Sequence, residues 1–456
     1  MQLTGPVFLF LFLPLSFFAV LPFSGRRRAA ALLIVSLCWY LCANRQNPAG
    51  MIVTGALLLL CWLLTLPRGA RRLRLTLGVA LPIAVWLFCR ITAEYGLWPR
   101  LSYPAGLTFV ALGLVSAAVD LYHAPDAAGA RRPVAFFGYV LFFPVLTFGP
   151  VIRYRRFRRM LAAERPSFAA FARGSRLFTA GYLKRAAGAA MLISALNRVL
   201  AVEGEALHLP AAGVLLILAG AALPLLVSGV SDMARGVASF YGLVLLPDVR
   251  LLPLDPARCF GGLCLSLSAF LDETVVRPVS CLRTRAARPL AWTLGFVCTV
   301  LFFRCRWEAL LLSLPLFAVT AAAAALGREP AKVRRVLLAV LLTPAYLLFA
   351  AGVLLPEPVL LFRMFSAASD DPYYLYQLFA ALSDARYLLL MIAVAAALLV
   401  WRHYRSFALL RLSVNARTRV AFAETLLLFV AFAGAVIFIL PRFPVLADQP
   451  FMRLYL

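Results

Sequence analysis

The chain alternates between long apolar runs and short clusters of arginine. A helix needs about 20 apolar residues to cross a hydrocarbon layer of about 30 Å, and several of the runs approach this length. The clearest of them are residues 5–23, 51–66, 211–230, 336–355 and 420–440. The pattern predicts an all-α polytopic integral membrane protein with about twelve spans and a single membrane domain over residues 1–456.

Composition and charge agree with this class. Apolar residues make up 63% of the 456 positions and charged residues 14%, which excludes an ordinary soluble domain. A net charge of +26 is typical of proteins that bind polyanions, but here the arginines lie in short clusters between apolar runs. That placement indicates control of membrane topology, and we expect no nucleic-acid partner. The 9 cysteines show no spacing typical of a zinc site, so we expect no metal.

The arginine clusters also assign an orientation. We place basic segments such as 26–28 and 68–74 in the cytoplasm, and the acidic segments 203–205 and 357–384 outside. No basic residue precedes the first apolar run, whereas arginines follow it, which is the reverse of a secretory signal. We therefore expect a retained first span, with both chain termini outside.

One apolar segment, residues 134–148, does not fit a complete crossing. It ends at Gly149-Pro150, because proline lacks an N–H and disfavours a helical conformation in the residue before it. A full crossing would carry the arginines within 153–159 to the outside. We expect this segment to be re-entrant and to end at the Gly-Pro pair.

A second short segment, residues 259–271, would span only about 20 Å as a helix. We expect a membrane-depth half-helix that carries Ser266 and Ser268 and ends at Asp272-Glu273. The alternative is an amphipathic surface helix.

Several motifs follow one another along the chain in the order found in a known family. They are Tyr103-Pro104-Ala105-Gly106-Leu107-Thr108-Phe109, Val119-Asp120-Leu121-Tyr122, Gly149-Pro150-Val151-Ile152-Arg153-Tyr154 and Ser228-Gly229-Val230-Ser231-Asp232-Met233-Ala234. With them the chain resembles the membrane-bound O-acyltransferase (MBOAT) family. The resemblance is to the bacterial branch that contains the alginate O-acetyltransferase and the teichoic-acid D-alanyl transfer protein.

The resemblance implies a ring of tilted helices with re-entrant half-helices in the bacterial inner membrane, with a core over about residues 100–350. It also implies acyl transfer, for example of acetyl, to a hydroxyl of an extracytoplasmic polysaccharide, helped by a buried histidine. The implied donor is acetyl-CoA or an acyl carrier protein, used without a bound cofactor. The implied partners are membrane lipid and an extracytoplasmic acetyl-carrier or esterase-like protein.

The catalytic pattern of that family is degenerate in this chain. The Ser-Leu-Ser run at 266–268 and the following Pro278 fix the register, and Cys264 then occupies the histidine position. A second family histidine, expected shortly before Trp307, is absent as well. We interpret His123 as a solvated loop residue, place His208 in the outer acidic loop and place His403 at an inner boundary.

Cys264 leaves two functional alternatives open. A thiol titrates near ~8.5 and apolar surroundings raise its pKa, so Cys264 would carry an acyl thioester only beside an activating cation or base, with Arg277 and Arg304 as candidates. Otherwise Cys264 is a small packing residue, and the protein is a catalytically inactive assembly partner or conduit.

Other candidate residues line the donor path or channel. Asp232 and Arg235 are expected to share a helix face and to pair, either as a functional pair at the membrane boundary or as solvated charges at a turn. The arginines that begin at Arg153 would contact an anionic donor or anionic lipid. The candidate set for the acyl donor or channel is Arg153, Tyr154, Ser231, Asp232, Arg235, Ser266 and Ser268.

Overall fold

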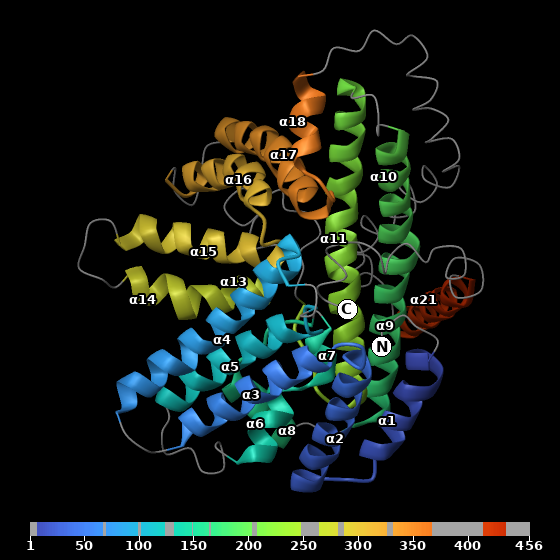
Figure 1. Ribbon diagram of the computed structural model, residues 1–456. Coiled ribbons are helices and arrows are strands. Elements are labelled where there is room, and N and C mark those ends of the chain that lie inside the picture. Colours follow the sequence, from blue (N-terminus) through green and yellow to red (C-terminus); the bar gives the residue numbers. More distant parts are fainter. Residues whose placement is uncertain are drawn as a thin grey trace.

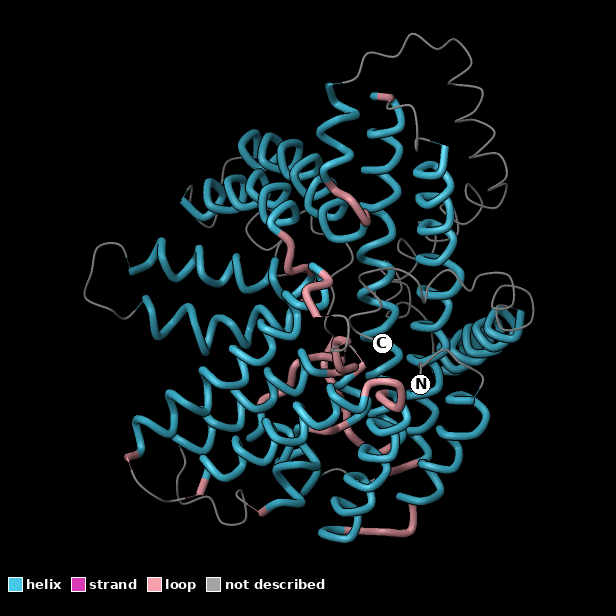
Figure 2. The backbone as a smooth tube through the Cα atoms, in the orientation of Figure 1, coloured by secondary structure: helices cyan, strands magenta, loops and turns pink. Residues whose placement is uncertain are grey.

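The computed structural model shows a helical protein, and no strand occurs among the residues that it describes (Figures 1 and 2). Those residues are 7–66, 70–98, 102–123, 132–147, 149–163, 166–202, 208–247, 264–280, 287–325, 332–366 and 414–434. His403 and the beginning of the predicted 259–271 helix lie outside them.

The first half of the chain forms short and long helices joined by tight connections. In order they are η1 (Phe8–Phe12), α1 (Leu13–Val20), α2 (Gly25–Ala43), α3 (Pro48–Thr65), α4 (Arg71–Tyr95), α5 (Leu107–His123), α6 (Pro133–Val140), α7 (Phe143–Leu146), α8 (Tyr154–Ala163), α9 (Phe168–Leu183), η2 (Lys184–Ala189) and α10 (Ala190–Val202). The elements η1 and η2 are π-helical turns, which are rare and occur often at functional sites.

The second half begins with the longest described helix and continues with shorter ones. In order they are α11 (Leu209–Phe240), α13 (Leu265–Leu271), the π-helical turn η3 (Asp272–Val276), α14 (Arg277–Ser280), α15 (Ala287–Phe303), α16 (Trp307–Ala325), α17 (Lys332–Leu354), α18 (Val359–Ser366) and α21 (Val414–Gly434).

Helix α11 packs against α7, α9, η2, α10, α17 and α18 (Figure 1). It has 32 residues and is therefore about 48 Å long. The rod formed by α9, η2 and α10 lies along one side of it, while α17 and α18 contact it from another. Nearly every residue in the C-terminal half of α11 is buried, including the whole Ser228–Ala234 motif.

Glycines allow α9 and α11 to approach backbone to backbone. Gly174 and Gly181 lie two turns apart on α9 and face Gly236 and Gly229 on α11. A Cβ added at Gly174 would stand 2.6 Å from the Gly236 carbonyl oxygen, so no larger residue fits without moving a helix. Small residues at a helix crossing are typical of membrane bundles, where close backbone packing replaces the hydrophobic effect.

Among the residues that the structure describes, the three helices α3, α4 and α11 are long and apolar enough to cross a membrane. Shorter apolar helices, among them Phe8–Val20 and Trp307–Ala322, accompany them. Large apolar side chains are exposed on the outer helices, for example Phe10, Phe18 and Ile52, which is a surface that water does not favour. The architecture is consistent with a polytopic membrane protein, and the number of spans stays a prediction.

The two segments expected to be half-helices differ from expectation. The run at 134–148 breaks at Leu141-Phe142, before the Gly-Pro pair, because Pro144 begins the separate short helix α7. The expectation that a helix ends at Asp272-Glu273 is wrong. The chain continues through the π-helical turn η3 into α14, since the wider turn accommodates Pro278 without a clash on the preceding turn.

Several arginines donate hydrogen bonds to carbonyl groups at the C-terminal ends of helices, where four carbonyls otherwise lack a partner. Arg304, only 2% exposed, donates to the backbone oxygens of Val353 at 3.1 Å and Pro356 at 2.9 Å, and also to that of Leu355, at the end of α17. Arg90 donates to the Phe303 oxygen at 2.9 Å, at the end of α15.

The same arrangement recurs near the arginine clusters that the sequence pattern assigned to loops. Arg28 is 3% exposed and donates to the backbone oxygen of Tyr241, just after α11. Arg71 and Arg74 donate to backbone oxygens at the ends of α5 and α3. Arg28 lies in the first turn of α2 and closes a buried helix end, and the cytoplasmic location of the segment 26–28 stays a prediction.

Candidate functional site

The loop 149–153, which connects α7 to α8, lies where α5, α6, α11 and α13 meet. Its first residue, Gly149, packs tightly: an added Cβ would stand 2.7 Å from Val145 Cα and 3.3 Å from Ala234 Cβ on α11. Two of the sequence motifs, one in the loop and one on α11, are thus in contact. A side chain at position 149 would push them apart.

Hydrogen bonds from different helices hold the loop in place. The Val151 N–H donates to Ser266 Oγ at 2.7 Å, which ties the loop to α13. The Tyr139 hydroxyl donates to the Ile152 backbone oxygen at 2.6 Å, from α6. The Tyr154 N–H donates to Ser116 Oγ at 3.1 Å, on α5. Ser266 therefore anchors the loop, which gives it a structural role at the predicted site.

Arg153 forms a bridge of charges across the loop. Its guanidinium contacts Asp120 Oδ1 on α5 and Glu273 Oε2 on η3, each at 2.5 Å. The other oxygen of Asp120 accepts the Arg155 N–H at 2.9 Å. Burial lowers the pKa of Arg153, but the hydrogen bond and the charge of Asp120 outweigh burial and raise it, so the guanidinium stays charged. The described contacts of Arg153 are with carboxylates of the protein.

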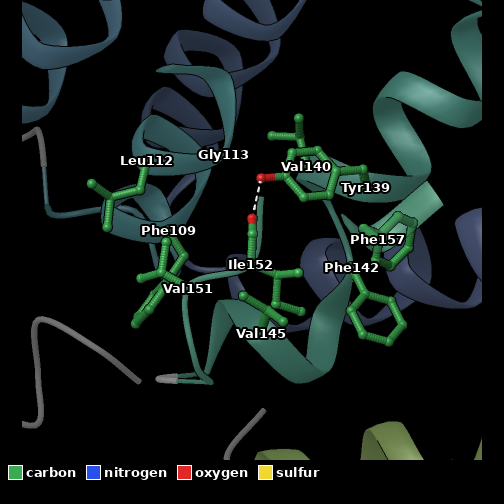
Figure 3. Close-up of a pocket in the computed structure, with 10 residues that line it drawn as sticks. All are labelled: Phe109, Leu112, Gly113, Tyr139, Val140, Phe142, Val145, Val151, Ile152 and Phe157. Atoms are coloured by element: carbon green, nitrogen blue, oxygen red, sulfur yellow. Dashed lines mark hydrogen bonds between the residues drawn. The ribbon is translucent and has the colours of Figure 1, made fainter. Parts of the chain in front are cut away.

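A small apolar cavity of about 20 Å³ lies behind the loop (Figure 3). That volume suits about one water-sized or methyl-sized group. The Tyr139 hydroxyl points toward the Ile152 carbonyl at its edge. The lining residues are Phe109, Leu112, Gly113, Tyr139, Val140, Phe142, Val145, Val151, Ile152 and Phe157.

Cys264 immediately precedes α13 and occupies its N-cap position. The side chain is 3% exposed, and its backbone oxygen accepts the Ser268 N–H at 3.0 Å. Ser268 is half-buried, one turn along the same helix. The two cations considered as activators are engaged elsewhere: Arg277 contacts Asp272 at 2.9 Å, and Arg304 closes the end of α17.

Asp232 and Arg235 pair as their spacing predicts, at 2.5 Å. Both are buried, 7% and 8% exposed, so the interpretation as solvated charges at a turn is wrong. Lys184 of η2 contacts the second oxygen of Asp232, and helix periodicity does not predict this contact between two helices. Ser231 is 1% exposed, and its hydroxyl has no hydrogen-bond partner within the described part of the chain.

The two histidines that the structure describes stand at helix ends. His123 is exposed at the end of α5, in agreement with a solvated residue. His208 immediately precedes α11 as its N-cap residue and is only 5% exposed, and its location on the outer side stays a prediction.

Asp120 was visible in a sequence motif, but not as a site residue. We expect Asp120→Asn to lower the free energy of unfolding by about 1.5–3 kcal/mol, the range for a hydrogen bond to a charged group. Arg153→Gln should have a similar effect, and the double variant should cost less than the sum, because one contact is shared. Thermal unfolding of detergent-purified protein measures this. Arg156→Gln, on the exposed side of α8, is the matched control, and strict additivity would contradict the bridge.

The chain matches no family model. A protein of Pseudomonas putida named probable alginate O-acetylase AlgI is 28% identical to it, over 53% of this chain and 53% of that protein. The chain therefore spans about half the length of the curated relative that it matches. This similarity supports an MBOAT-like family.

Proposed function

We propose that this protein is an O-acyltransferase of the MBOAT type in the bacterial inner membrane, which moves an acyl group, most simply acetyl, to a hydroxyl of a cell-envelope polysaccharide outside. The donor would be acetyl-CoA or an acyl carrier protein. The partners would be membrane lipid and an extracytoplasmic acetyl-carrier or esterase-like protein. The similarity to the probable alginate O-acetylase and the apolar helices support this proposal.

One observation carries the proposal: blocks far apart in the sequence meet around the loop 149–153. Gly149 contacts Ala234 of α11, and Val151 is bonded to Ser266, two positions from Cys264. The cavity beside Val151 has room for a methyl-sized group, which suits a short acyl chain. A reaction centre built from these blocks would have Cys264 as its reactive side chain.

The chemistry then proceeds through a thioester. The Cys264 sulfur attacks the acyl carbonyl of the donor, the donor thiol leaves, and it takes the proton that the Cys264 thiol has lost. The acceptor hydroxyl next attacks the acylated Cys264, forming the ester, and its proton returns to the cysteine sulfur. The side chain ends each cycle as the thiol with which it began.

A catalytically inactive protein of the same fold is the alternative. It is favoured by the contacts of Arg277 and Arg304, which are committed to Asp272 and to the end of α17 rather than to activating a thiol. Such a protein would serve as an assembly partner or conduit, with Cys264 as a packing residue.

A transfer assay in proteoliposomes distinguishes the active acyltransferase from the inactive alternative. Purified protein is reconstituted with polysaccharide on one side and acetyl-labelled acetyl-CoA on the other, and label in the polysaccharide is counted. We expect ester-linked label above that of protein-free vesicles, removed by mild alkali. Protein that is monodisperse and correctly inserted but transfers no label, from acetyl-CoA or from an acetylated carrier protein, would favour the inactive alternative.

A further inference from the structure

Arg185 stands apart from the other buried arginines. It is 0% exposed, and all three of its side-chain nitrogens lack a hydrogen-bond partner among the described residues. Arg28, Arg90 and Arg304 are equally buried, but each donates to a carbonyl at a helix end. A buried charge without a partner is costly, so Arg185 calls for a negative group that the described helices do not supply.

The close packing of η2 on α11 holds Arg185 in its buried position. It lies in η2, and its backbone nitrogen is 3.0 Å from where a Cβ on Gly229 would stand. The glycine crossing of α9 and α11 therefore presses this turn against the buried half of α11. The adjacent Lys184 contacts Asp232, whereas Arg185, the second cation of the turn, has no carboxylate partner among the described residues.

A second orphaned polar group accompanies it. Tyr182, three positions earlier, lies on the same face of the rod, is 0% exposed, and has a hydroxyl without a partner among the described residues. Its ring packs edge-on against Phe432 of α21, with centroids 4.9 Å apart, which fixes its orientation. Two independent donors are thus buried together, and a π-helical turn is the kind of local irregularity often found at functional sites.

We propose that Arg185 and the Tyr182 hydroxyl form a binding site for a phosphate group. A guanidinium offers five N–H donors in a planar fork that matches phosphate oxygens, and the phenol adds one more. Together these donors are more than the two oxygens of a single carboxylate can accept in one plane. The phosphate belongs either to an anionic phospholipid or to a soluble phosphate compound. The site does not depend on the proposed acyl transfer.

The test uses the full chain, purified in detergent and stripped of lipid. Binding of phosphatidylglycerol, with phosphatidylcholine for comparison, is counted by native mass spectrometry. Inorganic phosphate is titrated against the midpoint of thermal unfolding, because a ligand that binds the folded state raises that midpoint. The variants are Arg185→Gln, Arg185→Lys and, as the matched control, Arg173→Gln on the exposed side of α9. Size-exclusion chromatography verifies that each is folded.

We expect Arg185→Gln to weaken binding of one of these ligands at least about tenfold, the order of effect when a buried hydrogen-bonded charge is removed. Arg185→Lys should retain part of the affinity, and Arg173→Gln all of it. Loss confined to phosphatidylglycerol assigns the site to a lipid, and loss confined to inorganic phosphate assigns it to a soluble compound. Without ligand, Arg185→Gln should unfold no earlier than wild type, since it removes an unpaired charge.

Two results would overturn the proposal. The first is equal affinity of wild type and Arg185→Gln for both ligands. The second is an unfolding midpoint of Arg185→Gln well below that of ligand-free wild type, which would mean that a carboxylate of the chain itself neutralises Arg185. Neither the binding measurement nor the unfolding midpoint depends on acyl-transfer activity. Failure of this proposal and failure of the proposed function are therefore distinguishable.

Discussion

Gly181→Leu is expected to prevent assembly of the helix bundle. A Cβ at position 181 would stand 2.5 Å from the Gly229 carbonyl oxygen and 2.6 Å from the Met233 nitrogen. Both are backbone atoms of α11, so no side chain can rotate away, and the two helices must separate. Overpacking of a core costs about 1–3 kcal/mol where neighbours can shift, and we expect at least the upper end here. The yield of monodisperse protein and the midpoint of thermal unfolding measure the effect.

Gly213→Leu is the matched control for this prediction. Gly213 lies on α11, is exposed, and has nothing within 4 Å of its added Cβ, so leucine there should leave folding unchanged. Gly181→Ala should already destabilise, because the Cβ alone makes the clash. Equal unfolding midpoints for the leucine variants at 181 and 213 would show that α9 and α11 do not cross as closely as described.

The crossing has a consequence for the candidate site. Gly229 and Gly236 bracket Asp232, and Lys184 reaches Asp232 only because η2 lies against α11 at the same crossing. Separation of the helices would therefore also break the Lys184–Asp232 contact and expose Arg185, whereas the pair of Asp232 and Arg235 within α11 would persist.

The elements set by local pattern could be predicted from the sequence. The apolar runs at 51–66 and 211–230 correspond to α3 and α11, and the pair formed by Asp232 and Arg235 follows from helix periodicity alone. Contacts between distant segments could not be predicted. The partners of Arg304 lie at 352–356, and that of Arg28 follows α11, so only the fold reveals that these arginines close helix ends.

The same limit applies within the site. The sequence pointed to Arg153 and Ser266 but not to their relation, in which one bridges Asp120 and Glu273 and the other anchors Val151. It also placed a helix end at Asp272-Glu273. A nearby proline often marks such a boundary, but the π-helical turn η3 carries the chain past Pro278.

The proposed function makes its strongest prediction at Cys264. If this thiol carries the acyl group, wild-type protein incubated with acetyl-labelled donor and then denatured should retain label that hydroxylamine releases. Cys264→Ala should retain none and should lose at least about a hundredfold in transfer, as expected when the reacting group of an active site is removed. Cys264 immediately precedes α13, two positions from Ser266, whose hydroxyl accepts the Val151 N–H of the loop 149–153.

The matched control is Cys89→Ala, since Cys89 is as buried as Cys264, at 1% against 3% exposed, but lies on α4. It should keep both label and transfer. Cys264→His tests the predicted sequence register, in which Cys264 occupies a histidine position, because an imidazole there can act as a general base. Transfer without retained label in Cys264→His would mean that a histidine at this position supports transfer without an acylated side chain. Undiminished label on Cys264→Ala would place the acylated residue elsewhere and remove the cysteine from the proposal.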